Sequence, residues 1–242
     1  MTDDVWSTRR TSFGSAADAY AVGRPSYPEA ALDWVLPPAA TRVLDLAAGT
    51  GRLTEQLLAR GLQVIAVEPD DAMRAHVPAA ATAMPGTAED IPVDDASVDA
   101  VVVGQAFHWF DGPAAMAEIA RVLRPGGTVG LLWLLADDSD GLTERVCEVV
   151  ADDEMRASII DPDQDPPYAD VEGVTRPERR LFAHTEPYDA DRLTAWVLSL
   201  SRTILLPERE RAALLDRLRA VTPDGRFDLH HVCEVWRGER RA

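Results

Sequence analysis

The sequence predicts an α/β fold built on a mostly parallel sheet with helices on both faces. Two observations predict it. Between residues 41 and 133, apolar segments of strand length alternate with segments whose apolar residues recur at helical spacing. The strand segments are apolar at almost every position, which indicates that both faces of the sheet are covered. Strands that alternate with helices in this way pair in parallel, because each helix forms a crossover connection.

The strand candidates of this region are runs of small and branched apolar residues, as expected of buried strands. They are RVLDLAA (42–48), LQVIAVE (62–68), a weaker candidate over 79–84, SVDAVVVG (97–104) and TVGLLWLL (128–135). Parallel strands end at one common edge of a sheet, and ligands of such folds bind outside that edge. The residues that directly follow these strands are therefore the first candidates for a functional site.

Helices are predicted between these strands, over residues 50–61, 69–77 and 112–127. The first places its leucines on one face and ends at Gly61. The third stops before Pro125, because the residue that precedes a proline is disfavoured in helical conformation.

After Trp133 the pattern predicts more helices, a loop and a final strand. The helices are expected over 141–156, 189–202 and 207–221, the acidic and proline-rich loop over 161–170, and the strand over 227–238. No internal repeat or low-complexity linker divides the chain, so we expect a single domain over residues 1–242.

Composition excludes several classes of function. The chain has 41 acidic residues against 24 basic ones, all of them Arg, and a net charge of −17. A nucleic-acid partner is not expected, because phosphate contacts need a basic face, and mechanisms that require a lysine are excluded. The longest apolar stretch is far shorter than a membrane span, and the N-terminus has no apolar signal segment. With two distant cysteines, these features predict a cytoplasmic protein without a membrane partner.

The most informative stretch is VLDLAAGTGRLTEQL. A strand ends in Asp45, and a turn that contains Gly49 and Gly51 leads into a helix. Glycines there let the backbone approach a ligand and expose N–H groups at the positive end of the helix. The alternative is an ordinary glycine turn, which many α/β proteins contain. The second strand ends in Glu68, an acid that is well placed to bind the ribose hydroxyls of a nucleoside cofactor.

This turn departs from the dinucleotide-binding fingerprint. The third glycine of the fingerprint is Thr54 here. Asp45 also precedes the turn, where its carboxylate would oppose a pyrophosphate but would suit the cationic group of an amino acid.

At this point the chain resembles a known family. VLDLAAGTG, VEPDDAM, GTAEDIP, VDAVVVGQAFHWF and IARVLRPGGTVGLLW follow one another as in the class I S-adenosylmethionine-dependent methyltransferases. RPSYP before this region and WVLSLS and VWRGER after it are similar to the small-molecule branch that includes trans-aconitate-like methyltransferases. The resemblance implies a Rossmann-like seven-stranded sheet. Its last two strands, 179–188 and 227–238, would form an antiparallel hairpin.

Carried over position by position, the resemblance implies a set of residues that contact S-adenosylmethionine. The set is Asp45, Ala47, Gly49 and Gly51 for the methionine moiety, Glu68 for the ribose, Pro69 and Met73 beside the adenine, Ala88 and Glu89 at its edge, and Gln105 and Ala106 beside the sulfonium. Two positions depart from the family pattern. Ala47 replaces the first glycine, and Thr87 stands where many relatives carry an Asp for the adenine amino group.

The resemblance also divides the chain into three parts. Residues 1–40 would form an N-terminal lid, in which Tyr20 and Arg24 can reach the carboxylate of the cofactor. Residues 41–135 would form the cofactor-binding core, and residues 136–242 would supply helices, a loop and final strands on the acceptor side.

GQAFHWFD (104–111) supplies the candidate catalytic residue. His108 lies directly beyond the strand that would end next to the methyl group, and an imidazole can act as a general base near neutral pH. The alternative is that His108 only hydrogen-bonds a loop. We also expect Trp109 to face the acceptor. Phe107 and Phe110 are expected to hold the loop by packing, and Asp111 to cap the following helix.

No metal site is expected. DPDQDPPYADVE has acids at the spacing of a calcium loop, but Pro166 occupies the position that requires Gly for a sharp turn. His230 and His231 are adjacent on a predicted strand and must point to opposite faces. The loop is expected to help cap the acceptor site, with Tyr168 as its one bulky residue.

These features predict an S-adenosylmethionine-dependent methyltransferase that acts on a small-molecule acceptor, most simply by O-methylation. If the acceptor is a carboxylate, no base is needed, and nearby Arg residues would orient it. One alternative is a protein that binds the cofactor without transferring a methyl group, as a partner subunit or a catalyst of another reaction. A nicotinamide-dependent dehydrogenase is a more distant one. The sequence does not predict the oligomeric state.

Overall fold

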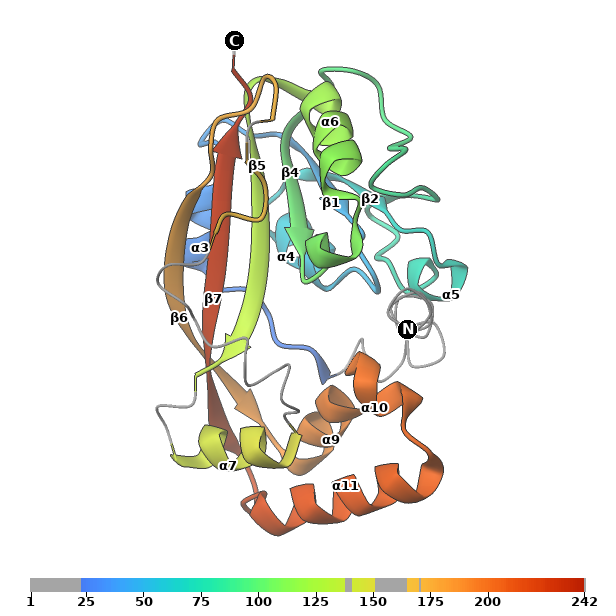
Figure 1. The fold of residues 1–242 in the computed structure, drawn as a ribbon, viewed down its shortest axis with the longest axis vertical. Coiled ribbons are helices and arrows are strands. Elements are labelled where there is room, and N and C mark those ends of the chain that lie inside the picture. The colour runs from blue at the N-terminus through green and yellow to red at the C-terminus, as the bar shows by residue number, and fades with distance from the viewer. Residues whose placement is uncertain (1–22, 138–140, 151–164, 170, 242) are drawn as a thin grey trace. The chain divides into compact units, whose positions relative to one another are not determined.

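The computed structural model describes residues 23–137, 141–150, 165–169 and 171–241. Their central feature is a seven-stranded sheet in the order β3-β2-β1-β4-β5-β7-β6 (Figure 1). The strands are β1 (Arg42–Leu46), β2 (Gln63–Val67), β3 (Thr82–Met84), β4 (Val98–Gly104), β5 (Leu123–Ala136), β6 (Glu178–Tyr188) and β7 (Phe227–Glu239). The strands from β3 to β5 pair in parallel, and the C-terminal strands run antiparallel. The predicted fold class is confirmed, including the weak candidate that became β3.

Helices connect the strands at most of the predicted places. They are α3 (Glu29–Val35), α4 (Arg52–Ala59), α5 (Asp71–Arg74), the 3₁₀ helix η2 (Phe107–Trp109), α6 (Gly112–Val122), α7 (Gly141–Val150), α9 (Ala190–Leu198), α10 (Ser201–Leu205) and α11 (Glu208–Val221). Helix α3 was not predicted. The helix expected over 141–156 is observed as α7 up to Val150, and the rest of it lies outside the described residues. Within the part of the chain that the structure describes, no helix is long and apolar enough to cross a bilayer.

The helix predicted over 189–202 is interrupted. Helix α9 ends at Leu198, and Leu200 adopts an extended conformation before α10 begins. The Ser199 hydroxyl donates to the carbonyl oxygen of Trp196 at 2.6 Å, which satisfies a carbonyl of the last turn of α9. The apolar spacing continues through this break, so periodicity alone does not reveal it.

The described residues fall into two compact units. The core unit comprises residues 26–134, 165–182 and 233–241, and the second unit comprises residues 23–25, 135–150 and 183–232, both without the undescribed positions. Strands β5, β6 and β7 contribute residues to both units. Each unit has its own hydrophobic core.

In the core unit, alternate strand residues face two different helix layers. On β1, Leu44 and Leu46 pack in the cluster that contains the apolar face of α6. Val43 points the other way, into the cluster that contains α3 and α4. Figure 1 shows α6 on one side of these strands and α3 and α4 on the other. This two-sided cover explains why the strands are apolar at nearly every position.

The second unit has a separate core formed by α7, α9, α11 and the nearby ends of β6 and β7. Its buried apolar residues are Val146, Val150, Tyr188, Leu193, Val197, Leu200, Leu214, Leu218 and Leu229. The leucines of α11 face this cluster at helical spacing, as the sequence pattern predicted.

Candidate functional site

The site is built at one edge of the core unit, where β1, β2 and β4 end side by side. The strands pair in parallel in the register Asp45 to Ala66 and Asp45 to Val102. The residues that follow them therefore lie along one edge. The turn over 47–51, Glu68 and the segment that begins at Gln105 are brought together there, as the sequence predicted.

The glycine turn after β1 has an unusual backbone. Ala47, Gly49 and Gly51 all have positive φ, at 58°, 58° and 86°. A Cβ atom on Gly51 would lie 2.6 Å from Cδ of Pro78, so this position excludes every side chain. The turn is tied to the next strand, because the Ala48 N–H donates to the carbonyl oxygen of Val67 at 3.1 Å. The turn therefore holds the first backbone N–H groups of α4 in a fixed position beside the ends of the strands.

Glu68 links the glycine turn to the second strand. Its side chain is buried, Oε2 accepts the N–H of Gly49 at 2.9 Å, and Oε1 accepts the N–H of Asp70 at 2.9 Å. Burial raises the pKa of Glu68 above its ordinary value, and the two backbone donors oppose that shift. Each carboxylate oxygen keeps a second lone pair, with which Glu68 could accept a further hydroxyl.

Asp45 is the most deeply buried acid of the site, with 1% of its surface exposed. The Thr54 hydroxyl donates to Oδ2 of Asp45 at 2.6 Å. Burial raises the pKa of Asp45 to about 7, and no cation forms an ion pair with it within the described ranges. A carboxylate in this position is suited to a cationic group of a ligand.

The residues expected around an adenine come from α5 and the segment after β3. Met73 and Ala88 are buried, and Pro69 is exposed. Oε1 of Glu89 accepts the N–H of Asp111 at 3.0 Å, which fixes this acid next to the start of α6. Thr87 pairs with Asp90 in an isolated antiparallel bridge.

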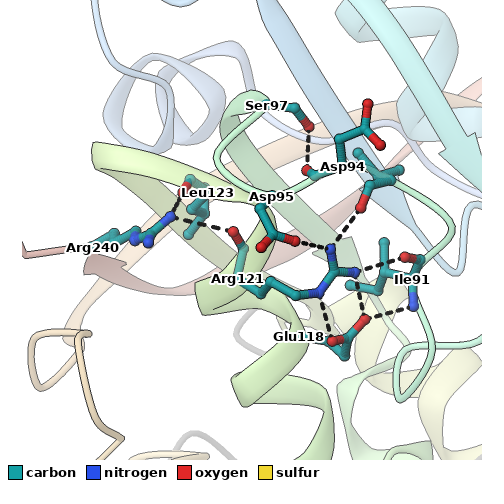
Figure 2. Close-up of polar contacts among 9 residues, drawn as sticks. Ile91, Asp94, Asp95, Ser97, Glu118, Arg121, Leu123 and Arg240 are labelled. Carbon is teal, nitrogen blue, oxygen red and sulfur yellow. Dashed lines mark hydrogen bonds and ion pairs between the residues drawn. The ribbon is translucent and has the colours of Figure 1, made fainter.

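Arg121 on α6 holds the segment that follows Ala88 and Glu89 (Figure 2). Its guanidinium donates to the carbonyl oxygens of Ile91 and Val93, each at 2.8 Å. Glu118 completes the arrangement, because Oε2 accepts the Ile91 N–H at 2.9 Å and pairs with Arg121 at 2.7 Å. The hydrogen bond from Arg121 also holds the pKa of Glu118 below its usual value. We call Arg121 and Glu118, with the backbone of Ile91 and Val93, the Arg121 clamp.

Gln105 and Ala106 lie directly after β4. Gln105 has a φ of 58°, an uncommon conformation for a residue with a side chain. Its backbone N–H donates to Leu132 at 2.8 Å, and its side-chain amide donates to Leu134 at 2.9 Å. These two bonds to β5 hold the turn in place, and Ala106 is buried behind it.

His108 lies in η2, and its side chain is exposed. Nδ1 of its ring is 3.4 Å from Nε1 of Trp133, whose N–H can only donate. The ring also lies 4.7 Å from that of Trp109. Partial desolvation lowers the pKa of His108 to about 4. A neutral His108 ring that accepts the Trp133 N–H at Nδ1 would carry its proton on Nε2.

The aromatic residues around His108 pack as predicted. Phe107 is buried and makes an edge-to-face contact with Phe110, with ring centroids 5.6 Å apart. Oδ1 of Asp111 accepts the N–H of Ala114 and caps α6, which confirms that prediction. Tyr168 is 7% exposed and its ring lies 6.4 Å from that of Phe107. Its role in acceptor binding stays a prediction.

Two predicted residues, Tyr20 and Arg24, are not among the described residues of the core unit. Tyr20 is outside the described residues. Arg24 belongs to the second unit, where its guanidinium donates to the hydroxyl and the carbonyl oxygen of Ser199, both at 3.0 Å. Within the described ranges no group of three or more His, Cys, Asp or Glu side chains is arranged to hold a metal ion.

Sequence reasoning missed two residues near this edge. A Cβ atom on Gly104 would lie 2.3 Å from the hydroxyl of Tyr27, so this tyrosine covers the end of β4. Its backbone is held by Gln56 of α4, which accepts the Tyr27 N–H and donates to its carbonyl oxygen, both at 2.8 Å. Trp133 was predicted only as part of a strand. The sequence feature that could have identified Trp133 as a site residue was its position near the end of a predicted strand.

Comparisons with known proteins agree with this geometry. A family model described as a methyltransferase domain matches residues 44–131. An uncharacterised methyltransferase of Mycobacterium tuberculosis is 46% identical over 86% of this chain and 84% of its own length. A malonyl-[acyl-carrier protein] O-methyltransferase of Erwinia pyrifoliae is 35% identical over 49% of this chain and 48% of its own. A proposed type II methyltransferase from Anaeromyxobacter dehalogenans has the same fold, with a TM-score of 0.60, 23% identity, and coverage of 90% of this chain and 97% of that one.

Proposed function

Because the chain belongs to the class I S-adenosylmethionine-dependent methyltransferases, whose methyl donor is S-adenosylmethionine, we propose that it methylates a carboxylate oxygen of a small-molecule acid. The donor would bind along the edge formed by the ends of β1, β2 and β4. The reaction forms a carbon–oxygen bond to the methyl group and breaks the carbon–sulfur bond. The products are a methyl ester and S-adenosylhomocysteine.

The observation that carries the proposal is the pair of buried acids at this edge. Asp45 and Glu68 are both less than a tenth exposed. Within the described ranges no cation pairs with Asp45, whereas the charge of Arg74 and two backbone N–H groups partly compensate Glu68. Buried carboxylates without a counter-charge are destabilising unless a ligand pairs with them. An ammonium group on Asp45 and a ribose diol on Glu68 would satisfy both, and S-adenosylmethionine carries both groups.

The other expected contacts are compatible with this placement. Met73 and Ala88 supply apolar surface for an adenine, and the Arg121 clamp holds the segment after Ala88. Gln105 uses its amide on β5, so its contribution beside the sulfonium would come from its backbone and its fixed turn. Arg24 and Tyr20 remain proposed contacts of the N-terminal segment.

His108 would act as a hydrogen-bond donor to the acceptor. The Trp133 N–H points at Nδ1, which leaves the proton of the neutral ring on Nε2. An Nε2–H group can orient an anionic oxygen but cannot remove a proton from it. A carboxylate acceptor needs no base, because its oxygen is already a nucleophile. This geometry supports the donor role over the base role that the sequence suggested.

The names of the relatives support the same reaction class. The Erwinia pyrifoliae protein and a second relative from Methylococcus capsulatus are malonyl-[acyl-carrier protein] O-methyltransferases, and each matches about half of this chain. This chain spans 48% and 47% of their lengths. The match therefore supports a shared methyl-transfer core, and the choice of acceptor is part of our proposal.

Methyl transfer from methyl-labelled S-adenosylmethionine to a panel of small acids tests the proposal. The panel contains mono-, di- and tricarboxylic acids and, for each, the matched alcohol and amine. We expect label only in base-labile esters of the acids. Label in an amine or ether product would contradict carboxylate methylation. Cofactor binding with no transfer to any compound in the panel or in a metabolite extract would favour a binding protein.

A substitution series at His108 separates the two roles of its ring. Gln can donate a hydrogen bond from its amide but cannot serve as a base, and Ala can do neither. We expect His108→Ala to lower kcat/KM for the best acid about 10–100-fold and His108→Gln to retain most of the activity. Equal losses in both variants, with unchanged cofactor affinity, would contradict the donor role.

A further inference from the structure

Thr54 forms a buried pair with Asp45 that the roles assigned so far do not use. Thr54 is the third residue of α4, has no exposed surface, and lies against the end of β1. Its hydroxyl lies 2.6 Å from Oδ2 of Asp45. A hydroxyl has one proton to donate, and here it goes to the carboxylate rather than to a helix carbonyl.

The surroundings of Asp45 make this bond important. Glu68 approaches from the end of β2 and carries the same charge, α4 contributes Thr54, and β4 faces Asp45 with Val102. Within the described residues, Thr54 is the side chain that supplies Asp45 with a hydrogen bond, and no cation compensates its charge. Within the described residues, the ionised form of Asp45 is therefore favoured by neutral groups of Thr54, its hydroxyl and its backbone N–H.

We propose that Thr54 is a positioning residue for S-adenosylmethionine. Its hydroxyl donates to Oδ2 of Asp45 and favours the carboxylate form, which would pair with the ammonium group of the cofactor. This inference rests on the proposed function, since it assumes that the ammonium group binds Asp45.

A pH dependence of cofactor binding follows. Burial raises the pKa of Asp45 to about 7, the Thr54 hydroxyl lowers it, and the charge of Glu68 raises it. An ammonium group pairs with the ionised carboxylate and not with the neutral acid. Affinity should therefore fall as the pH drops through this pKa and reach a plateau above it. Removal of the hydroxyl should move the midpoint to higher pH.

The test measures S-adenosylhomocysteine affinity by calorimetry between about pH 5.5 and pH 9. Wild type, Thr54→Ser and Thr54→Val are compared, because Ser keeps the hydroxyl and Val keeps the shape. We expect wild type and Thr54→Ser to share one midpoint near pH 7. Thr54→Val should bind about fivefold more weakly at pH 7, with its midpoint raised by about one pH unit and most of the affinity recovered near pH 9.

Three results would overturn the inference. An unchanged profile in Thr54→Val would remove any role for the hydroxyl, and a uniform loss at every pH would make Thr54 merely structural. Absence of binding in wild type at every pH would contradict the proposed function itself, which separates the two failures. If Thr54→Val does not fold, carbon-13 titration of Asp45 in wild type and Thr54→Ala provides the second measurement. An equal Asp45 midpoint in those two proteins would also overturn the inference.

Discussion

Ala47 has a left-handed backbone conformation at the start of the cofactor turn, with a φ of 58°. A side chain in this region costs roughly 1–2 kcal/mol, and Gly avoids that penalty. We expect Ala47→Gly to raise the free energy of unfolding by about 1 kcal/mol or less, because Gly also makes the unfolded chain more flexible. Urea unfolding measures it. Ala48→Gly is the control and should be destabilising, since Ala48 has no such strain; a loss in both variants would contradict the account.

Asp45 gives a second prediction at the residue scale. Its pKa in the folded protein is about 7, above its ordinary value of 3.8. Folding is therefore favoured by the bound proton at low pH, and this stabilisation is lost as the pH rises through 7. Asp45→Asn should raise the free energy of unfolding of the ligand-free protein by about 1–2 kcal/mol at pH 8 and change it little near pH 4.

Thermal unfolding of wild type and Asp45→Asn at the two pH values checks this prediction. The same variant should lose S-adenosylhomocysteine binding, because an amide does not pair with an ammonium group. If Asp45→Asn were less stable than wild type at pH 8, the ionised Asp45 would not destabilise the folded protein, and the prediction would be wrong.

The sequence predicted the location of individual residues where that location follows from their position along the chain. Asp45 lies one residue before the end of β1, Glu68 directly follows β2, and these two strands pair in parallel. Asp111 directly precedes α6. It did not predict the bonds from Thr54 to Asp45 or from Trp133 to His108. Those bonds join different elements, and their geometry depends on tertiary packing that no local pattern encodes.

At the scale of elements, the Arg121 clamp connects α6 to the segment that follows the predicted adenine contacts (Figure 2). Arg121→Met keeps the length of the side chain but loses the donors to Ile91 and Val93. We expect it to lower the free energy of unfolding by about 1–2 kcal/mol and to weaken S-adenosylhomocysteine binding. Urea unfolding and calorimetry measure the two effects.

Arg219→Met is a suitable control for the clamp. Arg219 pairs with Asp216 on the exposed face of α11, and such surface pairs contribute little. Its effect on stability should stay within about 0.5 kcal/mol, with cofactor affinity unchanged. If Arg121→Met behaved like this control, the clamp would have no role in the cofactor site.

Helices and strands were predictable where the spacing of apolar residues agreed with the glycines and prolines that end an element. Apolar runs marked β1, β2 and β4, glycines followed β1 and ended β4, and Pro125 marked the region where α6 gives way to β5. The break between α9 and α10 and the short helix α3 were missed. In the first case the apolar spacing continues across Ser199, and in the second the segment is only seven residues long.

At the scale of the whole molecule, the net charge of −17 opposes an anionic acceptor at long range. Salt screens this repulsion, with a Debye length of about 10 Å at 0.1 M. We therefore expect kcat/KM for a carboxylic acid to rise between about 20 mM and 0.2 M NaCl. A steady decrease over that range would indicate that local positive charge dominates the approach of the acceptor.

Whole-molecule architecture could be predicted because the motifs of the middle hundred residues occur in the family order. The alternation of strands and helices already predicted the parallel strands, and the resemblance added the C-terminal antiparallel strands. The division of the described residues into two units was not predicted. It depends on which residues of β5, β6 and β7 pack with which helices, and the apolar pattern of a long strand does not indicate such a division.

The central claim is that the edge of β1, β2 and β4 binds S-adenosylmethionine through Glu68 and Asp45. Calorimetric titration of S-adenosylhomocysteine into wild type, Glu68→Gln and Glu55→Gln tests it most directly. Glu55 lies on the exposed side of α4, so its variant controls for the loss of one negative charge. We predict one ligand per chain for wild type and Glu55→Gln, with binding at least about tenfold weaker in Glu68→Gln. Equal affinity in all three proteins, or no binding to wild type, would contradict the claim.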